Sequence, residues 1–269
     1  MAKEYKAMSI GPSTTATKVL LERANAALPF SQATAILDNG CGPGPIISKI
    51  ITTYGAEIPE TVPFLAADFS VAMVAQVDAS KKEGVEAGNK VWQRVETKVL
   101  NAMDMQGVPD SSHSHITAGW VYFMTPDPQK CLSESLRILQ PGGVLALSSW
   151  EGNQWMDIMK VIGDVRPDKV LPELPKAWSN VDLLKAELET AGFKDVTSER
   201  VAVTMQFENR DSFVDMLVTK MPHMVAMTKD MSAEDVQRLR ELSIAKCEEM
   251  SSEEPGELHG TVLIAVGKK

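Results

Sequence analysis

The chain has few cysteines, no long apolar run and no cluster of basic residues. Three cysteines among 269 residues cannot build a disulfide scaffold, and so sparse and odd a set suits a reducing compartment. No apolar stretch reaches the roughly 18 residues that a membrane-spanning helix needs. The first residues also lack the apolar segment of a secretory signal. We therefore expect a cytoplasmic protein that does not act at a membrane.

Positive charge is in the minority, because 27 Lys and Arg face 36 Asp and Glu, for a formal charge of −9. An acidic chain repels phosphate backbones, so we do not expect nucleic acid as a partner. The histidines and cysteines show neither H-E-x-x-H nor C-x-x-C spacing, so we expect no metal site. With 44% hydrophobic and 23% charged residues, the chain is typical of a folded globular protein.

Strand-like and helix-like segments alternate along most of the chain, which predicts an α/β fold with a doubly wound, mostly parallel sheet of seven strands. Strands are expected at 35–37, 62–67, 95–100, 115–123, 144–149, 196–207 and 260–267. Helices are expected at 12–28, at 45–54, after Ser70 and after Asp127-Pro128, and within 208–259 with Asn209 and Ser232 as caps. We expect four parts: a helical cap over 1–32, a core over 33–205, a helical insertion over 206–259 and a last strand over 260–269.

A glycine-rich loop follows the first strand, in the sequence ILDNGCGPG. Gly40, Gly42 and Gly44 permit positive φ and a close approach of backbone to ligand. Such a loop at the carboxyl end of a strand is the usual ligand crevice of an open α/β sheet. The dinucleotide fingerprint fails because its third glycine place holds Pro45, and a P-loop fails because no lysine follows until Lys49.

Further candidate binding residues follow the first three strands. Asp38 can reach a ligand's cation or hydroxyl groups. Asp68, 24 residues beyond Gly44, can accept both hydroxyls of a ribose, with Phe69 against an adenine face and Met73 one helical turn later. The polar turn at 101–104 can read an adenine edge. The three strand ends thus predict one crevice for an amino-acid end, a ribose and an adenine.

Taken together, these motifs resemble the class I S-adenosylmethionine-dependent methyltransferases. The resemblance covers roughly residues 33–267, through ILDNGCGPG, ADFSVAM, NAMDMQGVPDSS, LRILQPGGVLALSSW, AGFKDV and GTVLIAVGKK. It implies a Rossmann-like fold and S-adenosyl-L-methionine as cofactor. The cofactor-binding residues that it and the strand ends imply are Asp38, Asn39, Gly40, Gly42, Gly44, Asp68, Phe69, Met73, Asn101, Ala102 and Met103.

A narrower resemblance is to the small-molecule methyltransferases of fungal secondary metabolism, thiol methyltransferases of dithiol natural products among them. It rests on PDSSHSHITAGW, residues 109–120, and on the pair Trp150 and Trp155. Many family members carry an acid where Ser114 stands, whereas Ser114 with His115 matches the fungal subgroup. The resemblance implies methyl transfer to a thiol, hydroxyl or amine of a small apolar molecule, by a monomer or homodimer.

Several residues have two interpretations. Trp120, Trp150 and Trp155 follow the fourth and fifth strands and belong either to the core or to an apolar wall of the substrate pocket. His113 and His115 share one face of a strand and are either satisfied within the sheet or weak candidates for a general base. Six methionines between 205 and 231 form a helix core or an adaptable lid.

Three functions are compatible with these residues. The first is methyl transfer to a small molecule, for which the residues identify no catalytic base. The second is a fold relative that keeps S-adenosylmethionine but catalyses a cyclisation or rearrangement. The third is a regulatory binding module with a vestigial site, which the intact glycine loop and Asp68 argue against.

Overall fold

The computed structural model describes residues 10–269, so the first nine residues of the expected helical cap lie outside the described part. The chain divides into two compact units. The sheet unit comprises Ala16–Ser149, Pro175–Val201 and Leu263–Lys269, and the helical unit comprises Trp150–Leu174 and Ala202–Val262 with the first residues of α2. In the described part, no helix is both long and apolar enough to cross a membrane.

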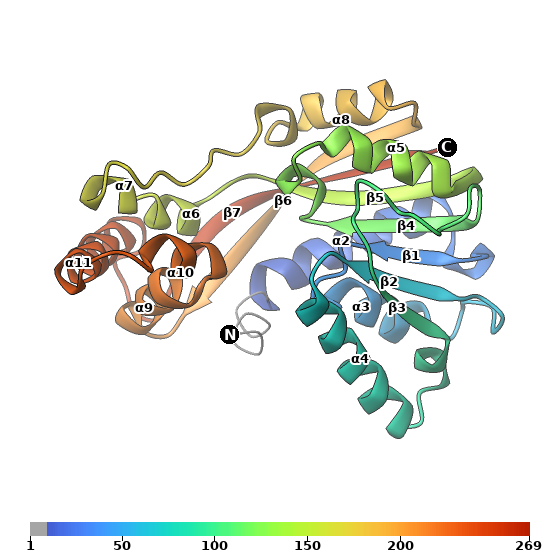
Figure 1. Cartoon of the computed structure of the whole chain (residues 1–269), viewed down its shortest axis with the longest axis horizontal. Coiled ribbons are helices and arrows are strands. Elements are labelled where there is room, and N and C mark those ends of the chain that lie inside the picture. Colours follow the sequence, from blue (N-terminus) through green and yellow to red (C-terminus); the bar gives the residue numbers. More distant parts are fainter. Residues whose placement is uncertain (1–9) are drawn as a thin grey trace. The chain divides into compact units, whose positions relative to one another are not determined.

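Seven strands form one sheet in the order β3-β2-β1-β4-β5-β7-β6 (Figure 1). The pairs from β3 to β5 are parallel. The start of β5 pairs with the end of β7 through Gly142 and Lys269, so β7 runs the other way. The strands are β1 (Ile36–Asn39), β2 (Phe64–Asp68), β3 (Val95–Val99), β4 (His113–Gly119), β5 (Leu139–Asn153), β6 (Lys194–Phe207) and β7 (Gly256–Lys268). The predicted seven-stranded, mostly parallel sheet is confirmed.

Helices of the sheet unit begin where local signals predict them. In α5, Asp127 is the N-cap and its side chain accepts from the Lys130 amide at 3.2 Å, with Pro128 in the first turn. The helix α8 lies beside α5 (Figure 1), where Gln129 hydrogen-bonds Glu187. The α-helices are α2 (Ile10–Ala27), α3 (Pro45–Tyr54), α4 (Val71–Glu86), α5 (Pro128–Ile138) and α8 (Val181–Thr190). Short 3-10 turns lie at Phe30–Gln32, Lys90–Arg94, Tyr122–Met124 and Lys176–Trp178.

The helical unit holds the segment between β6 and β7 and a second segment that follows β5. The predicted caps are confirmed, since Asn209 accepts from the Ser212 amide and Ser232 from the Asp235 amide. Its helices are α6 (Gln154–Met159), α7 (Ile162–Val165), α9 (Arg210–Lys220), α10 (Pro222–Thr228) and α11 (Ala233–Met250). The unit is larger than the predicted insertion, because α6 and α7 pack against α11.

Several sequence-based boundaries were wrong. The fourth strand ends at Gly119 rather than at 123, because Trp120 takes a positive φ of 54° and a 3-10 turn follows. The fifth and the last strands are longer than expected, reaching Asn153 and starting at Gly256. Ser70 stands at the N-cap of α4, but its side chain makes no capping bond.

Candidate functional site

The glycine loop after β1 is held by three left-handed backbone positions. Gly40, Gly42 and Gly44 have φ of 73°, 53° and 89°. A Cβ on Gly40 would lie 2.5 Å from the Val121 side chain, so glycine is needed there for packing. A Cβ on Gly42 would meet no atom within 4 Å. Open space beside a backbone of this shape is what a ligand that approaches the chain requires.

The Asp68 carboxylate joins this loop to the end of β2. Its Oδ2 accepts from the Gly42 amide at 2.8 Å, and its Oδ1 accepts from the Ser70 amide at 2.8 Å. The side chain remains half-buried rather than enclosed. A carboxylate has about four acceptor positions, so two remain for the hydroxyls of a ligand. The geometry of Asp68 is compatible with the ribose contact, which stays a prediction.

Asp38 is buried at the carboxyl end of β1, beneath the glycine loop. Its side chain is 0% exposed. Thr117 Oγ1 donates to one oxygen at 2.8 Å, and the Ile47 amide donates to the other at 3.2 Å. Burial raises the pKa of this carboxyl group to about 7. Because no part of Asp38 is exposed, the predicted direct contact with a ligand is not available in this structure.

Asn39 is also enclosed, and it begins a buried polar network. Its Nδ2 donates to the Tyr122 hydroxyl at 2.9 Å, and that hydroxyl lies 2.6 Å from the Ser135 hydroxyl oxygen. The network joins the first strand end, the turn after β4 and helix α5. Burial raises the pKa of Tyr122 above its ordinary value. Asn39 is therefore placed to hold the turn that carries Trp120 and Val121.

Large apolar side chains are exposed where β2, β3 and β4 end. Phe69 is 78% exposed and Met124 67% exposed, and Val71 and Val99 are exposed as well. Met73 is half-buried one turn into α4. Exposed apolar groups next to an open glycine loop form the kind of surface that a ligand covers.

The turn after β3 is closed by a hydrogen bond to the side chain of its first residue, Asn101. Asn101 Oδ1 accepts from the Met103 amide at 3.0 Å, and Asn101 bridges to Asp104. Ala102 is buried and Met103 half-buried. The turn is thus a defined backbone shape at the strand end, with Met103 available beside it.

The three candidate tryptophans belong to two units. Trp120 follows β4 in the sheet unit, in a left-handed conformation that is rare for a bulky residue. Its amide donates to Ser148. Trp155 is 5% exposed and packs edge-on against Trp150, with ring centroids 5.3 Å apart. The core interpretation therefore fits Trp155. A strained backbone such as the positive φ of Trp120 is found mostly at functional sites.

Both candidate histidines lie at the opposite end of β4. His115 is paired in register with Ile36, at the start of β1, and Thr117 with Asp38. The loop at Gly40 is therefore about 13 Å further along the strands, at about 3.3 Å per residue. The structure does not bring His113 or His115 to the glycine loop, so the general-base interpretation has no geometric support.

The contacts of His115 explain its place in the sequence. Its Nδ1 lies 2.8 Å from the Ser114 hydroxyl, its Nε2 lies 2.9 Å from the Leu28 carbonyl oxygen, and its ring stacks on Phe30. Burial lowers its pKa, and burial lowers the pKa of His113 to about 4. Both rings are neutral at physiological pH. The serine-histidine pair thus makes buried structural contacts at the amino end of β4.

The arrangement fits the three parts of S-adenosylmethionine. The open side of the glycine loop suits the amino-acid end, spare acceptor positions on Asp68 suit ribose hydroxyls, and Phe69 with Met103 offers apolar surface for adenine. No group of three metal-binding side chains occurs among residues 10–269.

Sequence reasoning missed the residues that shape this site from a distance. Val121 contacts Gly40, and Tyr122 contacts Asn39, across about eighty positions of sequence. No local sequence pattern predicts contacts between residues so far apart in the chain. A signal did exist for Glu134 and Arg137, which stand three residues apart on α5 and form an ion pair.

Comparisons with known proteins agree with this geometry. Residues 37–147 match the family model described as a methyltransferase domain. The chain is 39% identical to methyltransferase ucsB of Acremonium over 267 residues, which is 99% of this chain and 92% of that protein. It is 26% identical to the acetylaranotin bis-thiomethyltransferase of Aspergillus terreus over 196 residues, 70% of this chain and 64% of that one.

Solved structures show the same fold at low sequence identity. An N-methyltransferase 2 of Haemonchus contortus, in complex with S-adenosylhomocysteine, aligns with a TM-score of 0.57 at 15% identity, over 100% of this chain and 56% of that one. The [4+2]-cyclase SpnF aligns with a TM-score of 0.53 at 17% identity, over 94% of this chain and 80% of that one. With the full-length match to ucsB, the glycine loop, Asp68 and the strand order place this chain in the class I S-adenosylmethionine-dependent methyltransferase family.

Proposed function

We propose that the chain methylates a small apolar natural product, and that the acceptor atom is a thiol sulfur. The observation that carries this is that neither histidine of the sheet unit lies beside the glycine loop, because both lie at the other end of β4. A thiol with a pKa near 8.5 is already a few per cent ionised at neutral pH, whereas an alcohol needs a base. The bis-thiomethyltransferase among the relatives supports the same choice.

In this proposal the residues of the sheet unit bind and orient. Asp68 accepts from the ribose hydroxyls, the glycine loop admits the amino-acid end, and residues 101–103 face the adenine. The bound cofactor supplies a methyl group already activated by its sulfonium. Alignment and exclusion of water supply the rest, and orientation of this kind contributes roughly 7–11 kcal/mol. Trp120, held in its left-handed conformation, is proposed to contact the acceptor.

The test uses three acceptors with one carbon frame: benzyl mercaptan, benzyl alcohol and benzylamine. Each is incubated with the protein and methyl-labelled S-adenosylmethionine, and the products are identified by mass. We expect the label on sulfur first, with S-adenosylhomocysteine released in equal amount. Asp78→Ala is a control, because Asp78 lies on α4 and accepts from Thr97 at the sheet edge.

Two outcomes would contradict the proposal. Faster labelling of the alcohol or amine than of the thiol would show that the acceptor class is wrong. The alternative function, a cyclisation or rearrangement, would give a product of unchanged mass and no S-adenosylhomocysteine from the natural acceptor. SpnF shows that this fold is compatible with a cyclase, but the full-length relative is a methyltransferase.

A further inference from the structure

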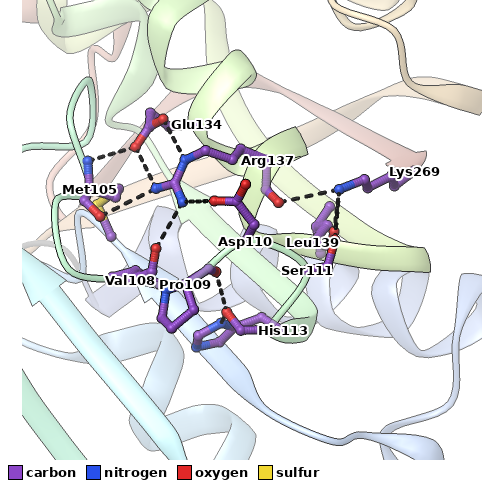
Figure 2. Close-up of polar contacts among 11 residues, drawn as sticks. Met105, Val108, Pro109, Asp110, Ser111, His113, Glu134, Arg137, Leu139 and Lys269 are labelled. Atoms are coloured by element: carbon purple, nitrogen blue, oxygen red, sulfur yellow. Dashed lines mark hydrogen bonds and ion pairs between the residues drawn. The ribbon is translucent and has the colours of Figure 1, made fainter.

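An ion pair on α5, between Glu134 and Arg137, binds the segment that follows the turn at 101–104. Arg137 Nε and Nη2 donate to the two carboxylate oxygens of Glu134, both at 2.8 Å (Figure 2). This two-bond geometry is the strong form of an arginine-carboxylate contact. The side chains are 30% and 20% exposed, so the pair is partly shielded from solvent. The pair accordingly lowers the pKa of Glu134.

The same two side chains hold both backbone groups of Met105. Glu134 Oε2 accepts from the Met105 amide at 2.8 Å, and Arg137 Nη2 donates to the Met105 carbonyl oxygen at 3.3 Å. Arg137 Nη1 donates further to the Val108 carbonyl oxygen at 2.8 Å and to Asp110 Oδ1 at 2.6 Å. Figure 2 shows the bonds of Arg137 converging on its guanidinium group, and the Met105 amide bonded to Glu134.

Met105 is the residue directly after the turn at 101–104. Its side chain is 0% exposed, so the end of that turn is fixed both by packing and by the ion pair. The segment from 105 to 112 contains no helix or strand of its own. Two hydrogen bonds lie within the segment, from the Val108 amide to the Met105 carbonyl oxygen and from Ser112 Oγ to the Pro109 carbonyl oxygen. The bonds with Glu134 and Arg137 of α5 add to them.

We propose that Glu134 and Arg137 are positioning residues for cofactor selection, which set the backbone of residues 101–103 so that it recognises the adenine edge. This inference rests on the proposed role of that turn. Neither side chain needs to contact the cofactor. Lysine could not replace Arg137, because one ammonium group cannot serve the carboxylate and two carbonyl groups in a fixed plane.

The chain contains a matched control in Arg94. Its Nη1 donates to the Pro59 carbonyl oxygen at 2.6 Å and to that of Val62 at 3.2 Å, and its guanidinium lies 5.1 Å from the Phe64 ring centroid. Arg94 thus also fixes a loop by bonds to carbonyl groups. That loop precedes β2, however, and so lies at the end of the sheet opposite to the glycine loop.

The experiment measures the affinities of two ligands by calorimetry: S-adenosylhomocysteine and S-inosylhomocysteine, which differs at the adenine edge. We expect wild type to prefer the adenosyl ligand. In Arg137→Met the affinity for the adenosyl ligand should fall about tenfold, the size of one lost hydrogen bond. The affinity for the inosyl ligand should fall less, so the ratio of the two should shrink. Arg137→Lys should behave in the same way.

Arg94→Met should reduce the melting temperature and leave the ratio of affinities unchanged. If Arg137→Met does not fold, Glu134→Gln tests the same contact with a smaller change, and it should shrink the ratio in the same direction. Equal losses for both ligands in the Arg137 or Glu134 variants would overturn the inference, because they would indicate general loosening.

A further variant tests separately whether residues 101–103 contact the adenine, the assignment on which this inference rests. Asn101→Ala removes the side chain that closes the turn. If Asn101→Ala leaves the ratio unchanged, the adenine assignment fails and the inference fails with it. If Asn101→Ala shrinks the ratio and Arg137→Met does not, the assignment stands and only the positioning role is overturned.

Discussion

At the amino ends of β1 and β4, Ser114 and His115 bond each other and the backbone, and the His115 ring stacks on Phe30. At the carboxyl ends of the neighbouring strands, Phe69 and Met124 are exposed and the space beside Gly42 is open. At one end of the sheet the polar side chains are therefore satisfied by bonds within the protein. At the other end, exposed side chains and open space remain for a ligand. Whether a polar motif has a structural role or a binding role thus depends on the end of the strand at which it lies.

Asp38 is the exception that most sharpens this comparison, since it lies near the carboxyl end but is buried like the histidines. Its pKa of about 7 exceeds the unfolded value near 3.9. The folded state therefore keeps a proton that the unfolded chain releases between about pH 4 and pH 7, so stability from this group falls as pH rises through that window.

Asp38→Asn stays neutral and should remove that dependence. The unfolding free energy of wild type minus that of Asp38→Asn should decrease from pH 4 to pH 8, by at most about 4 kcal/mol. Urea unfolding at several pH values measures the difference, in which the titration of distant groups cancels. A difference that is flat with pH would mean that Asp38 is charged in the folded protein.

Asp68→Ala tests the carboxyl end directly. The variant loses the acceptor for the Gly42 and Ser70 amides and for the proposed ribose hydroxyls, so cofactor binding should weaken by about 1.5–3 kcal/mol, roughly 10-fold to 150-fold. Calorimetry with S-adenosylhomocysteine measures this. Asp78→Ala, which alters an acid on the exposed side of α4, should bind as wild type does. Unchanged affinity in Asp68→Ala would refute the ribose assignment.

Local signals predicted much of the fold and part of the site. Asp127-Pro128, Asn209 and Ser232 each start a helix through bonds within a few residues, so sequence alone could place them. The burial of Asp38 could not be foreseen, because Thr117 covers it from 79 positions away. The early end of β4 could not be foreseen either, since a positive φ is rare for a residue as bulky as Trp120.

Substitutions at Gly40 and Gly42 should distinguish a glycine needed for packing from one needed for cofactor binding. Gly40→Ala places a Cβ against Val121 in a strained backbone and should reduce stability by about 2 kcal/mol or more. Gly42→Ala carries only the left-handed penalty of about 1–2 kcal/mol, but its methyl group enters the open space and should weaken cofactor binding. Denaturant unfolding and calorimetry on both variants decide. Equal stability losses, with unchanged binding in Gly42→Ala, would contradict this division.

The smallest effect on catalysis is expected at the amino end. If alignment suffices for a thiol acceptor, His115→Asn should slow single-turnover methyl transfer less than tenfold, well short of the roughly 10²–10⁴-fold loss for a general base. The rate of the variant should still rise with pH up to about 8.5, the ordinary pKa of a thiol, because the thiol ionises over that range. His113→Asn is the companion variant on the same strand.

Stability should respond where the rate does not. Burial holds the pKa of His115 below its unfolded value, so the stability that this neutral ring contributes is lost as pH falls below about 6.5. The unfolding free energy of wild type minus that of His115→Asn should therefore shrink from pH 7 to pH 5. A rate loss above a hundredfold, with folding and cofactor affinity intact, would instead make His115 catalytic. It would also mean that the strand end does not decide the role of the serine-histidine pair.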